Sequence, residues 1–205
     1  ISIWDPETDF QKSKDIPCNN WIHFMIRNGQ LDMTVVIRSN DIIWGASGIN
    51  WFEWSVIQEF VAYNVGAEVG KMYYFADSLH VYEHHFSKIR KIFTSTVAFR
   101  DMYEFHVKSP RFAVKIEDLD HKLDYILQSL SDLRYGNSSD YSIHVGDEFL
   151  DSCTDMLILY DCIKKKNFEA AAMKYMRIER ELSRDTGTLR PMYEPSDFQI
   201  AAAEY

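Results

Sequence analysis

A chain of 205 residues with 46% hydrophobic and 15% aromatic side chains can bury a sizeable core, as one large domain or one domain with an appendage. Its formal net charge of −9 argues against a general nucleic-acid-binding protein, because phosphate backbones are bound by clustered lysines and arginines. Its three cysteines are widely spaced and odd in number, which argues against a disulfide framework, and no apolar run reaches membrane-spanning length. We therefore expect a reducing, cytoplasmic setting.

The segment that leads to the first cysteine is predicted to be mostly loop. Residues 1–4 indicate a short strand, which Asp5-Pro6 ends, and the polar residues 7–17 indicate an exposed loop before Cys18. Because the chain starts without methionine and already inside an apolar stretch, we expect it to be a fragment of a longer protein.

A β-hairpin is predicted next. Asn28-Gly29 separates two runs rich in strand-forming residues, 21–27 and 31–38, and Asn-Gly between such runs is the strongest short signal for a hairpin. Residues 40–50 contain two glycines, a serine and two asparagines, so they predict a turn.

Helical periodicity begins after this turn. Apolar residues recur at spacings of three and four over residues 50–64, and Gly66 is expected to end the helix. Residues 69–82 return to the alternation typical of a strand, and residues 83–105 predict a second helix.

The C-terminal part is predicted to be helical. Amphipathic patterns cover residues 116–133 and 149–160, and a third covers residues 168–182. The last two, joined by a short polar link, indicate an αα-hairpin. Cys153 and Cys162 stand at core spacing, where a cysteine is usually a small buried hydrophobic residue.

These elements predict an α+β fold in two parts. Strands and a long buried helix form a mixed-sheet domain in residues 1–107, and residues 108–205 form a helical extension with the αα-hairpin and a mobile tail.

Short motifs occur in a fixed order around Cys18. They are Pro17-Cys18, Arg38-Ser39-Asn40-Asp41, a turn that contains Gly45 and ends at Asn50, and His80-Val81-Tyr82, all preceded by Trp4-Asp5-Pro6. Each motif is weak alone, but the ordered set, at similar separations over roughly residues 1–90, resembles the thymidylate synthase and pyrimidine-nucleotide (dUMP, dCMP) hydroxymethylase superfamily. The resemblance implies that residues 1–107 are the C-terminal part of a thymidylate synthase-like catalytic domain.

The resemblance further implies transfer of a one-carbon unit from 5,10-methylenetetrahydrofolate to C5 of a pyrimidine nucleotide, with Cys18 as the nucleophile. C5 of uracil is a poor nucleophile, and addition of a thiolate to C6 makes it enolate-like, so covalent catalysis divides a difficult step. Arg38 is the natural cation to stabilise the thiolate. Arg38 and Ser39 are also implied to hold the nucleotide phosphate, whose oxygens suit a guanidinium fork.

Four other residues are implied to bind the base, the sugar and the folate. Asn50 would read the base, because an amide accepts from N3–H and donates to O4 of uracil, whereas a cytosine site would more naturally carry an acid. His80 and Tyr82 would hold the sugar 3′-hydroxyl, and Asp41 would accept from the pterin N–H groups. The expected substrate is free dUMP rather than nucleic acid or a membrane component, and a homodimer is expected by analogy.

Departures from the family pattern favour a hydroxymethylase. Asn19 stands where thymidylate synthases usually have His, Ile37 replaces a usual Gln, and the turn that ends at Asn50 is one residue longer. The synthase tail that closes over the folate has no visible counterpart, and hydroxymethylases let water attack the one-carbon unit. In the family an N-terminal portion supplies a catalytic Glu and dimer arginines, and this sequence starts after it, so a non-catalytic nucleotide-binding or assembly relative is the alternative.

The site residues also have simpler interpretations. In the simpler interpretation, Arg38 and Asp41 are a surface ion pair, which contributes little to stability, and not part of a ligand site. Asn50 suits a helix N-cap, a role compatible with reading a base. His80 and His84 have the spacing of a metal-binding pair only if both are helical, and the predicted strand at His80 disfavours a metal site.

Overall fold

The computed structural model describes residues 1–10, 12, 16–94, 109–167, 169–171 and 173–174. The chain divides into two compact units, Ile1–Val97 and Ala98–Tyr205. The boundary predicted at residues 107 and 108 falls in the segment 95–108, which lies outside the described residues, so it stays a prediction.

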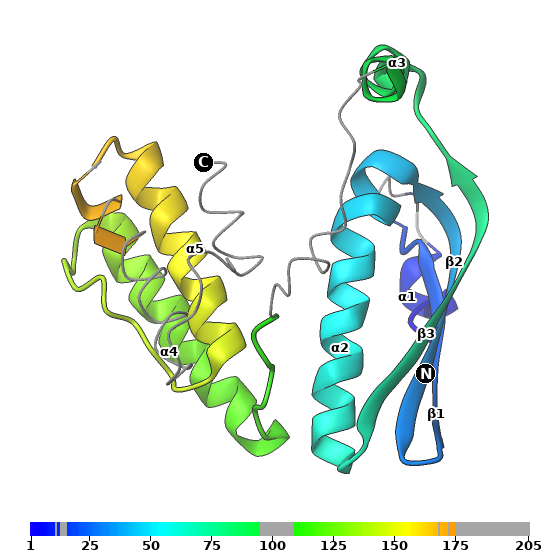
Figure 1. Cartoon of the computed structure of the whole chain (residues 1–205), viewed down its shortest axis with the longest axis horizontal. Coiled ribbons are helices and arrows are strands. Elements are labelled where there is room, and N and C mark those ends of the chain that lie inside the picture. The colour runs from blue at the N-terminus through cyan, green and yellow to red at the C-terminus, as the bar shows by residue number, and fades with distance from the viewer. Residues whose placement is uncertain (11, 13–15, 95–108, 168, 172, 175–205) are drawn as a thin grey trace, which may run out of the picture. The chain divides into compact units, whose positions relative to one another are not determined.

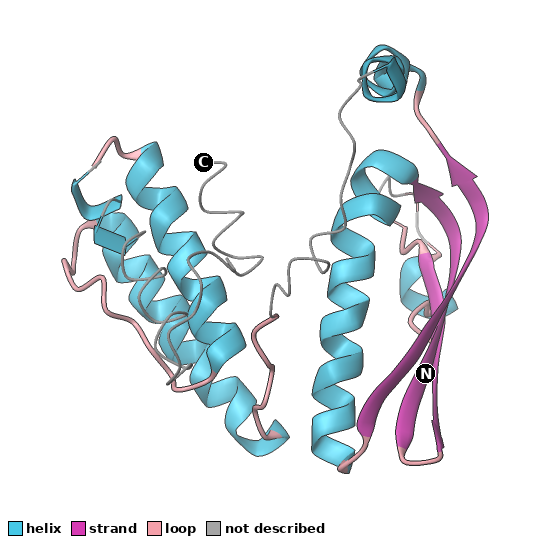
Figure 2. Ribbon diagram, in the orientation of Figure 1, coloured by secondary structure: helices cyan, strands magenta, loops and turns pink. Residues whose placement is uncertain are grey.

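The first unit is built on a three-stranded sheet of order β1-β2-β3, formed by β1 (Asn19–Arg27), β2 (Gln30–Asp41) and β3 (Glu68–His80). β1 and β2 are antiparallel, whereas β2 and β3 are parallel, and the three arrows of Figure 2 twist together. The predicted hairpin is confirmed: Asn28 and Gly29 both have positive φ, 51° and 79°, as a two-residue turn matching the strand twist requires.

Helix α2 (Asn50–Val65) connects the parallel pair and lies along the sheet in Figure 1. The predicted helix is confirmed, including its end at Gly66, which adopts φ 70° and caps the helix. Residues Trp54, Gln58 and Ala62, four apart, form its buried face. Trp54 packs in one core cluster with inward residues of β1 and β2: Ile22, Met33 and Val35.

The segment before Cys18 differs from the prediction. Instead of a strand, the first residues make one isolated bridge, between Ser2 and Trp21. The predicted loop of residues 7–17 begins with a short helix, α1 (Pro6–Asp9), because Asp5 accepts a hydrogen bond from the Glu7 N–H and proline suits the first helical position.

The turn predicted for residues 40–50 is also wrong in detail. β2 continues through Asp41, and residues Ile42–Ile49 form a single π-helical segment, η1, that runs directly into α2. The Asp41 carboxylate caps this segment, accepting from the Trp44 N–H at 2.6 Å. Single π-helical turns are rare and frequently occur at functional sites.

After β3 the chain forms a short 3-10 turn, η2 (Glu83–His85), and helix α3 (Phe86–Thr94). These elements agree with the start of the helix predicted over residues 83–105, and its remainder, from residue 95, lies outside the described residues.

The second unit contains α4 (Ile116–Tyr135) and α5 (Glu148–Lys164), which confirm two of the three predicted helices. Cys162 is buried in α5, and burial raises the pKa of its thiol. Residues 169–171 and 173–174 are helical, while the rest of the third helix, and with it the αα-hairpin, lies outside the described residues. Within the described part of the chain, no helix combines the length and apolar character needed to cross a membrane.

Candidate functional site

The loop that carries Cys18 is tied to strand β2 by one residue. The Arg38 backbone N–H donates to the Cys18 carbonyl at 2.9 Å. The Arg38 guanidinium donates through Nε to the Pro17 carbonyl and through Nη2 to the Ile16 carbonyl, both at 3.2 Å. These three bonds fix the backbone on both sides of the cysteine and leave its side chain exposed.

Beside this loop lies a hollow of about 470 Å³, at the edge of the sheet where β2 and β3 end. The parallel register places Ser39 opposite Ser78 and Asp41 opposite His80, so the ends of both strands reach the same edge. Six of the seven predicted site residues line the hollow: Cys18, Ser39, Asp41, Asn50, His80 and Tyr82. The other lining residues are Asn19, Asn40, Trp44, Gly45, His84 and His85.

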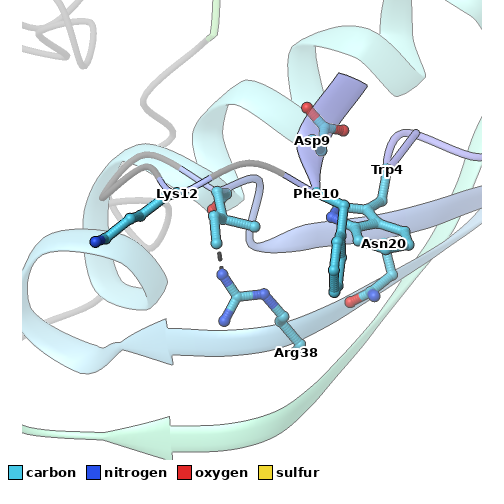
Figure 3. Close-up of a pocket in the computed structure, with 7 residues that line it drawn as sticks. Trp4, Asp9, Phe10, Lys12, Asn20 and Arg38 are labelled. Atoms are coloured by element: carbon cyan, nitrogen blue, oxygen red, sulfur yellow. Dashed lines mark hydrogen bonds between the residues drawn. The ribbon is translucent and has the colours of Figure 1, made fainter. Parts of the chain in front are cut away.

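The seventh residue, Arg38, lies elsewhere. Consecutive residues of a strand point to opposite faces, so the side chains of Arg38 and Ser39 diverge. Arg38 lines a second hollow of about 580 Å³ with residues that precede and open β1: Trp4, Asp9, Phe10, Lys12, Ile16 and Asn20. In Figure 3 its guanidinium rises from β2 toward the segment before Cys18, while the Trp4 and Phe10 rings meet edge to face, 6.5 Å apart. Joint phosphate binding by Arg38 and Ser39 stays a prediction.

The hollow is backed by two amide side chains. Asn50 Nδ2 donates to Asn40 Oδ1 at 3.0 Å, and Asn40 Nδ2 donates to the Tyr74 hydroxyl at 2.9 Å. Asn40 is only 2% exposed, whereas Asn50 is half-buried and lines the hollow. The backbone of Gly45 approaches both amides so closely that there is no room for a side chain: a Cβ at this position would collide with Asn40 Oδ1 and lie 3.0 Å from Asn50 Nδ2.

Tyr74 anchors this arrangement in the core. Its ring packs against the core cluster and lies 5.9 Å from the Trp51 ring. Burial raises the pKa of the Tyr74 hydroxyl, the neighbouring Cys18 raises it further, and a hydrogen bond with the Asn50 side chain opposes both. The hydroxyl is therefore neutral at physiological pH and acts as a fixed hydrogen-bonding group for the Asn40 side chain.

The two carboxylate oxygens of Asp41 differ in their hydrogen bonding within the described part of the chain. Burial by itself raises its pKa, but the opposing effects together, led by hydrogen bonds from the Trp44 and Ile43 backbone N–H groups, hold the pKa of Asp41 below its ordinary value. The rings of His85 and His80 act in the same direction. Its other oxygen, Oδ1, is buried and accepts no hydrogen bond from the part of the chain that the structure describes.

The lowered pKa of Asp41 predicts how the stability of the fold depends on pH. Because the folded-state pKa of Asp41 is depressed, its carboxylate stabilises the fold at neutral pH, and that contribution is lost as pH falls through the folded pKa. We expect Asp41→Asn, which keeps a good N-cap, to lose less stability than the wild type from about pH 5 down to about pH 2. Melting temperatures across this range measure the slope. Asp77→Asn, at an exposed carboxyl of β3, is the control, and equal slopes for wild type and Asp41→Asn would contradict the expectation.

Aromatic rings form the rim of the hollow beyond β3. The His80 and Tyr82 rings meet edge to face at 5.0 Å, and the His84 ring stacks on Tyr82 at 5.6 Å. The His80 Nδ1 lies 3.4 Å from the Ser78 hydroxyl. Among the described residues, no group of three or more His, Cys, Asp or Glu side chains is placed to hold a metal ion.

The motifs alone did not assign a role to three residues of this site: Asn40, Gly45 and Tyr74. Tyr74 had a usable signal, because the alternation of β3 places it on the inward face with Met72, and a buried tyrosine hydroxyl needs a partner. That partner, Asn40, is 34 residues away, so local patterns do not identify it.

Comparisons with known proteins bear on the same region. The family model described as thymidylate synthase matches residues 1–134. The chain is 43% identical over 91 residues to a deoxyuridylate hydroxymethyltransferase of Pseudomonas phage M6, covering 43% of this chain and 26% of that protein. It is 50% identical over 70 residues to the enzyme of the same name from Bacillus phage SP01, covering 34% and 18%. A solved thermostable thymidylate synthase A from Bacillus subtilis aligns with a TM-score of 0.43 at 27% identity, covering 48% of this chain and 34% of that one.

The match is therefore to a part of each relative. The chain spans about a fifth to a quarter of the length of these two phage relatives. The family model covers more than half of this chain and includes all seven predicted site residues. On this ground, the chain belongs to the thymidylate synthase family.

Proposed function

We propose that this chain supplies the nucleophile and the nucleotide-binding half of an enzyme that transfers a one-carbon unit to C5 of a uracil nucleotide, with dUMP hydroxymethylation favoured over thymidylate synthesis. One observation carries the proposal: an exposed cysteine and an amide suited to the uracil edge line the same hollow, at the shared end of two parallel strands. The identity with two phage deoxyuridylate hydroxymethyltransferases supports it.

Cys18 is the proposed nucleophile. Its thiolate adds to C6 of the uracil ring, and the electrons of the C5–C6 double bond move onto C5 and the C4 carbonyl oxygen. C5 would then bond to the one-carbon unit, whose bond to its carrier would break as C5 loses its proton. Water would add to the exocyclic carbon to give the hydroxymethyl group, and the re-formed C5–C6 double bond would expel the thiolate. The sulfur is unchanged at the end, and formation of a hydroxymethyl group needs no oxidant or reductant, whereas a methyl group would also need a hydride donor.

Residues around the cysteine orient the nucleotide. Asn50 accepts from N3–H and donates to O4, His80 and Tyr82 hold the sugar 3′-hydroxyl, and Ser39 donates to the phosphate. Arg38 supplies the positive charge for the phosphate from the other side of the cysteine loop, where its guanidinium already holds the Pro17 carbonyl. Residues 1–107 would then form the C-terminal part of the catalytic domain.

The hollow also fits the folate that the family uses. A pterin carries N–H donors, and the buried, unpartnered Oδ1 of Asp41 is an acceptor of the matching kind. The Trp44 ring, 72% exposed beside Asp41, offers an apolar face to a flat heterocycle. When bound, 5,10-methylenetetrahydrofolate supplies the one-carbon unit.

Three sequence features favour a hydroxymethyl product over a methyl product. Asn19 and Ile37 replace residues usual in thymidylate synthases, and the turn before Asn50, which folds as the π-helical segment η1, is one residue longer than in those enzymes. Asn19 lines the hollow, Ile37 pairs with Asn19 in the sheet, and η1 contributes Trp44 and Gly45 to the lining.

A fluorinated substrate tests the nucleophile and the nucleotide together. Because fluorine at C5 cannot leave as a proton does, 5-fluoro-dUMP with methylenetetrahydrofolate should trap a covalent adduct of the full-length protein, with its mass shift on the Cys18 peptide. Cys18→Ala should form no adduct, and Cys153→Ala should form it normally. With dUMP itself, the product mass distinguishes hydroxymethyl from methyl. A protein that binds dUMP reversibly but forms no adduct would favour the non-catalytic alternative.

We also propose that the active form is a homodimer, joined through the sheet face opposite the core. Trp21, Val36 and Phe75 form a row across all three strands on that face, and Trp21 and Phe75 are 41% and 58% exposed. Apolar side chains at this density on a sheet face mark an interaction surface. Sedimentation at micromolar concentration should show a dimer that Phe75→Glu dissociates, and a wild-type monomer would refute the proposal.

A further inference from the structure

The hydrogen-bonded row behind the hollow joins the core to the residue proposed to read the base. Its three members are Tyr74, Asn40 and Asn50, with bonds of 2.9 Å and 3.0 Å between them. Both amides are among the residues that line the hollow with Cys18, but Asn40 is only 2% exposed, and its Oδ1 accepts the hydrogen bond from Asn50 Nδ2. Asn40 is therefore placed to act on a ligand through its neighbour.

The direction of these bonds decides what Asn50 offers to a base. In the structure its Nδ2 gives one N–H to Asn40, which leaves the second N–H and Oδ1 for a ligand. That pair complements O4 and N3–H of uracil. If the Asn50 amide were turned over, Oδ1 would accept from Asn40 and from an exocyclic amine, and Nδ2 would donate to an unprotonated N3. The turned amide complements cytosine.

We propose that Asn40, held by Tyr74, fixes the orientation of the Asn50 amide and so sets the preference of the site for a uracil over a cytosine nucleotide. The proposal rests on the proposed function and names the determinant of its base specificity. Asn40 is a positioning residue, since its side chain is nearly fully buried and is hydrogen-bonded to Asn50 and Tyr74.

Several contacts hold the row in one arrangement. Asn40 is nearly fully buried, and the Gly45 backbone presses on both amides. The Asn50 backbone N–H donates to the Gly45 carbonyl, which ties the start of α2 to the same glycine. The Tyr74 ring lies between the core and the Trp51 ring, so its hydroxyl has little freedom to move.

The same contacts make a partial rearrangement unfavourable. If the Asn50 amide alone turned over, its oxygen would face Asn40 Oδ1 and both oxygens would lose their donor. A turn without such a loss requires both amides and the Tyr74 proton to move together. The Tyr74 hydroxyl is the one member that can donate or accept through the same atom, so the position of its proton can match either arrangement of the row.

A purely structural role for the row makes a different prediction. If Asn40 and Tyr74 only satisfied buried polar atoms, their removal would lower the stability of the protein and weaken the binding of every nucleotide to the same extent. If they orient Asn50, their removal changes the ratio of affinities for uracil and cytosine nucleotides. The ratio is therefore the decisive quantity, and it is independent of the fraction of folded protein.

Tyr74→Phe is the test variant, because it keeps the ring on Trp51 and removes only the hydroxyl. Calorimetry on the full-length protein gives dissociation constants for dUMP and dCMP. We expect the wild type to prefer dUMP, and Tyr74→Phe to reduce that preference by about fivefold to tenfold, the value of one neutral hydrogen bond. Tyr73→Phe, on the exposed side of the same strand, should leave the preference unchanged. Asn40→Asp, which only accepts on the Asn50 side, should retain it.

A second measurement needs no ligand. In the free protein, Tyr74→Phe should shift the side-chain amide resonances of Asn40 and Asn50 and leave those of Asn20 and Asn64 in place. Unmoved Asn50 resonances, or a dUMP preference within about twofold of the wild type, would overturn the assignment and leave the proposed function standing. A wild type that binds neither nucleotide would refute the proposed function and this assignment with it.

Discussion

Cys18→Ser is expected to lower kcat/KM for release of the C5 proton from dUMP by about 10³-fold or more, because a serine alkoxide is far scarcer at neutral pH than a thiolate. The substitution changes one atom on an exposed loop whose position is set by Arg38 through backbone carbonyls. The loop and the hollow should therefore keep their shape. Tritium release from dUMP labelled at C5 measures the effect in the presence of methylenetetrahydrofolate.

Cys153→Ser provides the matched control. Cys153 lies in helix α5 of the second unit and is not among the residues that line the hollow. Its replacement should leave tritium release within about twofold of the wild type. Equal activity of Cys18→Ser and wild type would remove Cys18 from the mechanism, whereas inactivity of the wild-type protein would point to the binding-only alternative.

Gly45→Ala is expected to lower the free energy of unfolding of the first unit by about 1–3 kcal/mol and to weaken dUMP binding strongly. The added methyl group would collide with Asn40 Oδ1 and press on Asn50 Nδ2. The Asn40 side chain yields only by breaking its bonds to Tyr74 and Asn50, and Asn40 is buried, so the broken bonds are not replaced by water. Urea unfolding and dUMP calorimetry measure the two effects.

Gly48→Ala is the control within the same π-helical segment. A Cβ at Gly48 meets nothing within 4 Å. Alanine there should be neutral or stabilising by up to about 1 kcal/mol, because glycine loses more backbone entropy on folding. If the two alanine variants behaved alike, the close approach of Gly45 to the amides would have no energetic consequence, and the proposed rigidity of the row would be wrong.

The parts of the fold that were predictable from the sequence are those set by local chemistry. Asn28-Gly29 specifies a hairpin through its own backbone preferences, and the spacing of apolar residues over residues 50–64 specifies one helical face. The π-helical segment Ile42–Ile49 was not predictable in this way. Its shape depends on the contact of Gly45 with two amides, one of which sits in the preceding strand.

The site shows the same division. The motifs indicated which residues gather around Cys18, and six of them line one hollow. They did not indicate that Arg38 and Ser39 diverge, although strand alternation contains that information. The bond between Asn40 and Tyr74 joins residues 34 positions apart, and only the parallel register of β2 and β3 brings the two side chains together.

The hydrogen bonds from Arg38 to the cysteine loop leave some of its guanidinium N–H groups available. A guanidinium carries five N–H groups, and the bonds to Ile16 and Pro17 occupy two of them, one on Nε and one on Nη2. Three N–H groups remain for an anion while both carbonyls stay bound. A phosphate can therefore bind to Arg38 while the guanidinium still holds the backbone of the cysteine loop. One side chain can fix the loop and bind the anion at the same time.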